Sequence, residues 1–176
     1  ILTDDNFATI VHAVEGGRAI YENIITFVRF QLTTNISAII TILAAQLGGL
    51  GVIFNAIQIL FVNIIADGPP AIALGVDPPK PGVMDRPPRR RDEVILTLRR
   101  LARIVFSALV ITAGTLGIYL VNRDEHPEAA LTMAFSVFVF FQLVNSFCVR
   151  SGDETVFTRH SLANRALLWA LAGVVL

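Results

Sequence analysis

The sequence predicts an all-α membrane protein, a polytopic transmembrane helix bundle with a short soluble segment at its N-terminal end. Hydrophobic residues make up 54% of the 176 residues and charged residues only 16%, against about 25% charged residues in typical soluble domains. Several uncharged runs are long enough for a helix to cross a bilayer. The formal net charge is zero, so nothing in the overall charge argues for a nucleic-acid partner. Cys148 stands alone, which excludes an intrachain disulfide framework and a cysteine-based metal cluster.

Residues 1–23 form the stretch with soluble character. Its apolar positions recur at helical spacing and predict an amphipathic helix outside the membrane: Phe7, Ile10, Val11 and Val14. Gly16 and Gly17 are expected to interrupt this helix. Residues 18–29 then keep the helical period into an uncharged run, 30–50, which is long enough to be the first span. We expect the soluble helix and this span to form one nearly continuous rod or two abutting helices.

The second span, residues 56–75, carries an acid near its middle and the signals that break a helix directly after it. Asp67 at the centre of a spanning helix costs about 2.5–3.5 kcal/mol on insertion scales, so it predicts a functional site. Gly68, Pro69 and Pro70 follow. Because proline cannot donate a main-chain hydrogen bond, carbonyl groups just before this point are expected to be freed.

Asn63 precedes Asp67 by four residues, which predicts that both side chains share one helical face. A carboxylate, an amide oxygen and freed carbonyl groups are hard oxygen ligands, and these suit a small hard cation such as Ca²⁺. The sequence therefore predicts an intramembrane cation site in this span.

The remaining chain alternates basic loops and apolar runs. Residues 77–100 are rich in proline and basic side chains, which predicts a cytoplasmic loop by the positive-inside rule. A third span is expected at about 101–121, with Gly114 and Gly117 forming a small-residue face. A fourth span at about 129–149, a cytoplasmic loop at 150–165 and a shortened fifth span at 166–176 complete the pattern. The last run covers only part of a bilayer, so we expect the chain to be a piece of a larger protein.

Polar side chains inside the spans are expected to face other helices and to outline the interior of the bundle. They are Thr33, Thr34, Asn35, Ser37, Thr41, Asn63, Asp67, Ser136, Gln142, Asn145 and Ser146. Histidines at 12, 126 and 160 fall in different compartments, which argues against a shared zinc site. The sequence has no catalytic Ser/His/Asp order, glycine-rich phosphate loop or cysteine pair.

Four stretches together resemble the C-terminal third of a P-type cation-transporting ATPase of the calcium-pump branch. They are Leu-Thr-Asp-Asp-Asn-Phe-Ala-Thr-Ile-Val (2–11), Val-Glu-Gly-Gly-Arg-Ala-Ile-Tyr-Glu-Asn-Ile (14–24), Val-Asn-Ile-Ile-Ala-Asp-Gly-Pro-Pro-Ala (62–71) and Met-Asp-Arg-Pro-Pro-Arg (84–89). Within that branch, three stretches, one of them inside 62–71, are most similar to the secretory-pathway calcium/manganese pumps and bacterial calcium ATPases. These are Phe-Val-Arg-Phe-Gln-Leu (27–32), Asp-Gly-Pro-Pro-Ala (67–71) and Phe-Val-Phe-Phe-Gln-Leu-Val-Asn (138–145).

The resemblance implies that residues 1–23 close the cytoplasmic phosphorylation domain and form a coupling segment. Residues 24–176 would be the transmembrane transport domain, with helices five to eight and the start of helix nine. Residues 18–50 would transmit the rotation of the phosphorylation domain, and the loop at 77–93 would brace that domain. The partners implied are the lipid bilayer and the N-terminal parts of the same pump: helices one to four and the actuator, nucleotide and phosphorylation domains. ATP and Mg²⁺ would bind outside this chain, so no catalytic residue is expected within it.

The family's cation ligands can be carried over position by position. The helix-five Asn of the two-ion sarcoplasmic-type pumps is matched by Asn35, and the helix-six Asn and Asp are matched by Asn63 and Asp67. Ala38 and Ala66 stand where those pumps have Glu and Thr, and Gln142 replaces a Glu on helix eight. The lost ligands belong to the first ion site. The resemblance thus implies a single Ca²⁺ held by Asn63 and Asp67, with Asn35 and Gln142 as partial or supporting ligands.

Other ligands would come from a helix-four carboxylate and carbonyl groups outside this chain. The expected function is ATP-driven calcium transport, and a bacterial plasma membrane is the expected location. One alternative is Mn²⁺ or another cation as the main cargo, because oxygen ligands serve calcium, magnesium and manganese alike. A second alternative is a non-catalytic membrane module that binds a partner pump.

Overall fold

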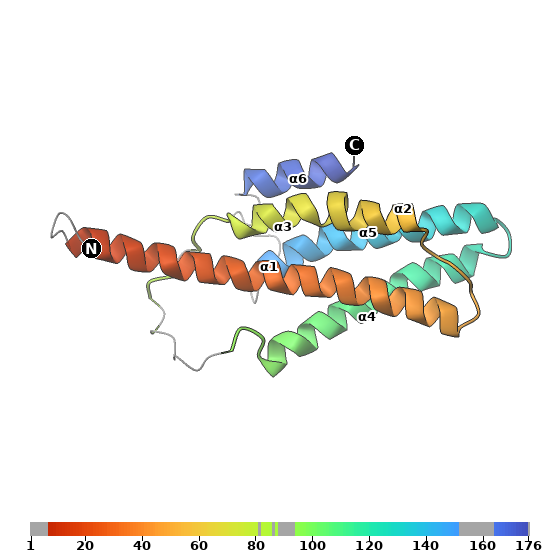
Figure 1. The fold of residues 1–176 in the computed structure, drawn as a ribbon, viewed down its shortest axis with the longest axis horizontal. Coiled ribbons are helices and arrows are strands. Elements are labelled where there is room, and N and C mark those ends of the chain that lie inside the picture. The colour runs from red at the N-terminus through yellow and green to blue at the C-terminus, as the bar shows by residue number, and fades with distance from the viewer. Residues whose placement is uncertain (1–6, 81, 86, 88–93, 152–163, 176) are drawn as a thin grey trace.

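The computed structural model describes residues 7–80, 82–85, 87, 94–151 and 164–175. In chain order the elements are α1 (Phe7–Leu47), α2 (Ala56–Phe61), the π-helix η1 (Val62–Ala66), α3 (Gly68–Gly75), α4 (Leu98–Asn122), α5 (Pro127–Ser151) and α6 (Arg165–Val175) (Figure 1). Four helical stretches are long and apolar enough to cross a membrane: Phe7–Leu47, Ala56–Gly75, Leu98–Asn122 and Pro127–Ser151. The predicted all-α membrane class is therefore confirmed for the described residues.

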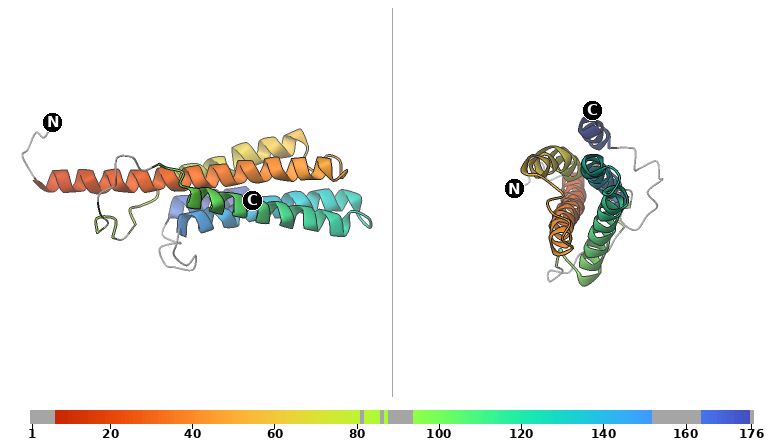
Figure 2. Two further views of the ribbon diagram at one scale, coloured as in Figure 1. Left: turned by 90° about the horizontal axis from the view of Figure 1, so that it is seen from below. Right: turned by 90° about the vertical axis from the view of Figure 1, so that its right-hand side faces the viewer.

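Helix α1 is a single rod of 41 residues. Gly16 and Gly17 lie inside it with helical neighbours on both sides, so the expected interruption is wrong and the continuous rod is correct. Each glycine costs a helix only about 1 kcal/mol relative to alanine, which the helix-forming residues around it outweigh. The N-terminal part of α1 projects beyond the other helices (Figures 1 and 2).

The second span is built from three short helices rather than one. Asn55 begins it with a capping box, because its side chain accepts from Gln58 N at 2.8 Å while the Gln58 side chain accepts from Asn55 N at 2.9 Å. The chain then widens into the π turn, whose end is marked by Asp67 N donating to Val62 O at 2.8 Å. Pro69 and Pro70 lie in the first turn of α3, where a missing N–H costs nothing. The predicted helix break thus takes the form of a π turn followed by a new helix start.

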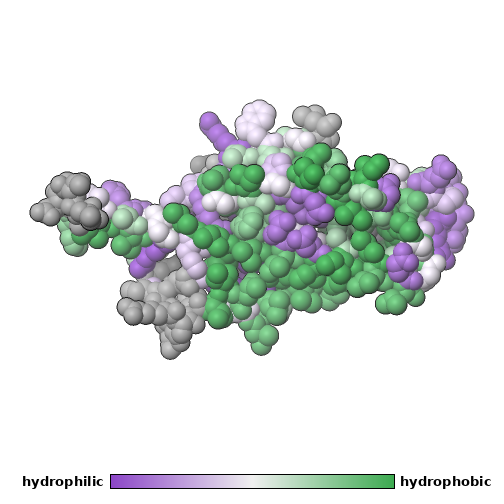
Figure 3. All heavy atoms as spheres, viewed as in Figure 1, coloured by the Kyte–Doolittle hydropathy of each residue, from purple (hydrophilic) through white to green (hydrophobic). Residues whose placement is uncertain are grey.

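Helices α1, α4 and α5 contact one another, and α3 packs against α1 and α6. Seen from the end, α1 and the α2–α3 segment lie opposite α4 and α5, with α6 at one edge (Figure 2). Between α1 and α4, Thr41 donates to Thr112 Oγ1 at 3.1 Å and Thr112 donates to Ser37 O at 3.3 Å. Apolar side chains cover much of the outer surface of the bundle, as a membrane-embedded face requires (Figure 3).

Two buried apolar clusters divide the interior along its length. The first cluster consists of Phe30, Ala71, Ala73, Leu74, Val149, Leu167 and Leu171. The second cluster consists of Ala45, Ile53, Phe54, Val62, Ile111, Ala134 and Phe138. On α1, on the α2–α3 segment and on α5, buried polar residues fall between the two clusters along the chain. We call these residues the polar layer: Thr33, Thr34, Ser37, Thr41, Asp67, Gln142, Asn145 and Ser146.

Candidate cation site

Asp67 is the acidic member of the polar layer. Its side chain is 1% exposed, and neither carboxylate oxygen has a hydrogen-bond partner. It is placed there by the local fold, because it lies at the junction between the π turn and α3. A buried carboxylate without partners is costly to maintain, so this position requires a bound cation or a proton.

The other members of the polar layer are neutral hydroxyl and amide side chains. The Thr34 side chain faces the carboxylate, but its hydroxyl group donates to Gln31 O at 3.1 Å instead. Gln142 is fully buried on α5, which contacts η1, and neither atom of its amide group has a partner. Nδ2 of Asn145 is likewise buried without a partner. Buried amides are normally hydrogen-bonded, so this concentration of unsatisfied groups indicates a site for something else.

The main chain adds a carbonyl group beside Asp67. The residues three and four positions after Ala66 are Pro69 and Pro70, which have no N–H to donate. The residue five positions after it, Ala71, donates its N–H to Asp67 O at 2.9 Å. The Ala66 carbonyl is therefore left without the main-chain donors that a 3₁₀, α or π turn would supply. This matches the freed carbonyl groups expected from the sequence.

Asn63 lies in the π turn, four residues before Asp67. It is exposed on the surface of this chain, and its side-chain amide donates to Ile59 O at 3.0 Å, whereas Asp67 is buried. The two side chains therefore differ in exposure on this chain although four residues separate them. The role of Asn63 as a cation ligand stays a prediction. Ser136 is also exposed, and Asn35 is partly buried on α1.

The sequence predicts Asn145 in the interior but does not single it out as a ligand, and in the structure it belongs to the polar layer. Its signal is its spacing: Asn145 follows Gln142 by three residues, which puts both on one face of α5. Within the described residues, no three His, Cys, Asp or Glu side chains gather into a metal-binding group. The arrangement is thus one carboxylate supported by amide, hydroxyl and carbonyl groups. Of the histidines, His160 lies outside the described residues.

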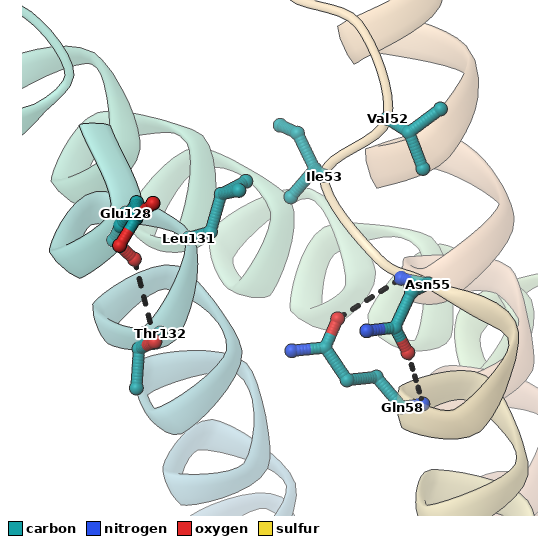
Figure 4. Close-up of a pocket in the computed structure, with 7 residues that line it drawn as sticks. All are labelled: Val52, Ile53, Asn55, Gln58, Glu128, Leu131 and Thr132. Carbon is teal, nitrogen blue, oxygen red and sulfur yellow. Dashed lines mark hydrogen bonds between the residues drawn. The ribbon is translucent and has the colours of Figure 1, made fainter.

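A separate hollow of about 260 Å³ opens at the end of the bundle where the α1–α2 connection faces the start of α5 (Figure 4). It is lined by Val52, Ile53, Asn55, Gln58, Glu128, Leu131 and Thr132. Asn55 and Gln58 are engaged in the capping box there (Figure 4). The hollow does not include Asp67 or any other member of the polar layer, so it is distinct from the candidate cation site.

The fold and the polar layer define a helical membrane segment with an intramembrane acid, and comparison with known proteins agrees. Residues 51–176 match the family model for the C-terminus of cation-transporting ATPases, so the chain belongs to this family. Among its relatives, the calcium-transporting ATPase 1 of Yarrowia lipolytica is 38% identical over 100% of this chain. The calcium-transporting ATPases type 2C member 2 of Rattus norvegicus and member 1 of Homo sapiens are 43% and 40% identical, again over 100% of this chain. The resemblance to P-type calcium pumps is confirmed.

The chain spans 19% of the length of each of these three relatives. The family and the apolar helices make it an integral, multi-pass membrane segment. The three relatives come from a yeast and two mammals, so they give no support to the expected bacterial plasma membrane.

Proposed function

We propose that this chain is the ion-binding and coupling part of a P-type pump that uses ATP to move calcium across a membrane. The observation that carries the proposal is Asp67, buried in the polar layer with both carboxylate oxygens unsatisfied. Oxygen donors of this kind are those that calcium prefers. The calcium-transporting relatives support the choice of cargo.

We further propose that the site holds a single ion. Among the described residues, the buried carboxylates are Asp67 and Asp77, and Asp77 is paired with Arg150 at 2.8 Å. Of these two described carboxylates, only Asp67 brings uncompensated negative charge to the interior. One carboxylate with neutral amides does not balance two divalent ions, and even one ion needs further negative charge from elsewhere in the pump.

Asp67 and the Ala66 carbonyl are the direct ligands in this proposal, with Gln142 and Asn35 as partial or supporting ligands. Asn63 contributes in a different way from Asp67. Its exposure on this chain leaves it available to meet an ion together with a ligand carried by another part of the pump, such as the helix-four carboxylate. ATP and Mg²⁺ would bind in those other parts.

The direct test is ion transport by the full-length protein in sealed vesicles. We expect ATP-dependent accumulation of calcium, with ATP hydrolysis that rises with calcium concentration. Parallel assays with manganese, and with magnesium alone, identify the cargo. A response to manganese with none to calcium would replace calcium as the main cargo, and no response to either would refute the proposed function.

A further inference from the structure

A second buried polar group lies beyond the far end of α3, away from Asp67. Asp77 accepts two hydrogen bonds from Arg150, from Nε at 2.8 Å and from Nη2 at 3.0 Å. The side chains are 3% and 2% exposed. This two-pronged geometry is the most specific that an arginine and a carboxylate can form. Arg150 is in the last turn of α5, so the pair joins α5 to the segment that follows α3.

Two asparagines complete the group. Asn164 donates from Nδ2 to Asp77 Oδ1 at 2.8 Å and to Ala73 O at 2.9 Å. Its own Oδ1 accepts from Leu167 N at 2.9 Å and so caps α6. Asn23 of α1 donates to the main-chain carbonyl of Asp77 at 2.7 Å. Four helices, α1, α3, α5 and α6, are therefore tied together at Asp77.

The group is linked to the cation site by two rigid elements. Helix α3 begins directly after Asp67 and ends two residues before Asp77, a length of about 12 Å at 1.5 Å per residue. On α5, Gln142, Ser146 and Arg150 follow one another every four residues and are all buried, so they share one face. The two helices share one apolar cluster, in which Ala71 and Leu74 of α3 lie with Val149 of α5, and just beyond it Asp77 is bonded to Arg150.

We propose that Arg150 and Asp77 are positioning residues for the cation site. Their bond fixes the register of α3 against α5, and this register holds the Asp67 carboxylate at the level of the Gln142 amide. Neither residue touches the ion. The inference rests on the proposed function, since it assigns to the pair a role in calcium affinity beyond stabilising the bundle.

The test compares variants of the full-length protein for calcium-dependent phosphorylation by ATP, normalised to the amount of protein in the membrane. The informative variant is the double change Asp77→Asn with Arg150→Met. It removes both charges of the buried pair together, so the protein is expected to accumulate normally, whereas either single change removes only one of them. The two-pronged bond is nevertheless lost. We expect normal maximal phosphorylation but a half-saturating calcium concentration raised about tenfold, within the range typical of coupling between two sites.

Arg150→Lys provides a second measurement that does not depend on the double variant. A lysine keeps the charge but cannot make the two-pronged contact, so we expect an intermediate rise in the half-saturating calcium concentration. Asp124→Asn is the matched control. It removes an exposed pair with Arg123, 3.3 Å apart, and is expected to leave the calcium dependence unchanged.

The outcomes separate the inference from the function on which it rests. If the wild-type protein shows no calcium-dependent phosphorylation, both are refuted. If the wild type responds but the double variant and Arg150→Lys keep its half-saturating calcium concentration, the pair only stabilises the fold and the positioning role is refuted, while the proposed function stands.

Discussion

The carboxylate of Asp67 is buried without a hydrogen-bond partner. The hydroxyl group of Thr34, which faces the carboxylate, donates to the main chain instead. An unpaired carboxylate in such surroundings raises the free energy of the folded state. Binding an ion would remove this free-energy cost. Two predictions follow at the scale of single residues.

The first prediction is that Asp67→Asn in the full-length pump abolishes calcium-dependent phosphorylation by ATP. The change keeps the shape of the side chain but removes the only uncompensated negative charge in the described interior. In calcium-free buffer the same variant should be more stable to heat than the wild type, because a buried amide costs less than a buried carboxylate. Unchanged calcium affinity in this variant would contradict the single-site proposal.

The second prediction is that Gln142→Ala weakens calcium binding without abolishing it. A neutral hydrogen-bonding group contributes about 0.5–1.5 kcal/mol, so the half-saturating calcium concentration should rise about two- to tenfold. Titrating calcium against phosphorylation measures the shift. Ser136→Ala, an exposed change on the same helix, is the control and should have no effect.

At the scale of elements, the lengths of the helices and the presence of the break could be predicted from the sequence, whereas the form of the break could not. Apolar runs and the Gly68-Pro69-Pro70 signal depend only on neighbouring residues, so they can be recognised in the sequence. The position of the π turn depends on more distant residues, because Val62 at its start packs in one apolar cluster and Ala71 after it packs in the other. The sequence therefore predicts the buried position of Asp67 but not the exposure of Asn63 on this chain.

The third prediction concerns the contact between α4 and α5. A methyl group at Gly114 would come within 2.7 Å of Cζ of Phe141, whereas one at Gly117 would meet nothing within 4 Å. We expected both glycines to allow close approach of a neighbouring helix, but only Gly114 does so in the structure. Gly114→Ala should destabilise the protein by about 1–3 kcal/mol through overpacking. Gly117→Ala should be neutral or stabilising by up to about 1 kcal/mol through helix propensity.

Thermal unfolding of the two glycine variants in the same detergent gives the comparison directly. Because the substitutions are identical and lie one turn apart on α4, any difference between them reports the contact with Phe141. Equal stabilities would show that the ring moves aside at no cost, and that the α4–α5 packing is looser than the structure indicates.

At the scale of the whole molecule, the interior separates two kinds of buried charge. Asp77 is bonded to Arg150 across 73 positions of sequence and is satisfied, whereas Asp67 is not. Sequence reasoning placed both Asp77 and Arg150 in loops at the membrane surface, because nothing in either residue's neighbourhood signals a partner so far along the chain. Once the buried charges that are paired within the protein are identified, the buried charge that remains unpaired is the candidate ion ligand.

The number of unpaired buried acids leads to the fourth prediction, which is the number of calcium ions bound by the intact pump. With Asp67 as the one unpaired acid in the described interior, and Ala38 and Ala66 offering no side-chain oxygen, the site lacks the charge to hold a second divalent ion. Equilibrium binding of radioactive calcium to the purified full-length protein should saturate at about one ion per phosphorylation site, because each added divalent charge in a low-dielectric interior needs its own counter-charge. The Asp67→Asn protein should show none of this binding. Saturation near two ions would mean that other parts of the pump bring at least two more acids to this layer, and the helix that carries them would then have to pack against the exposed face of Asn63.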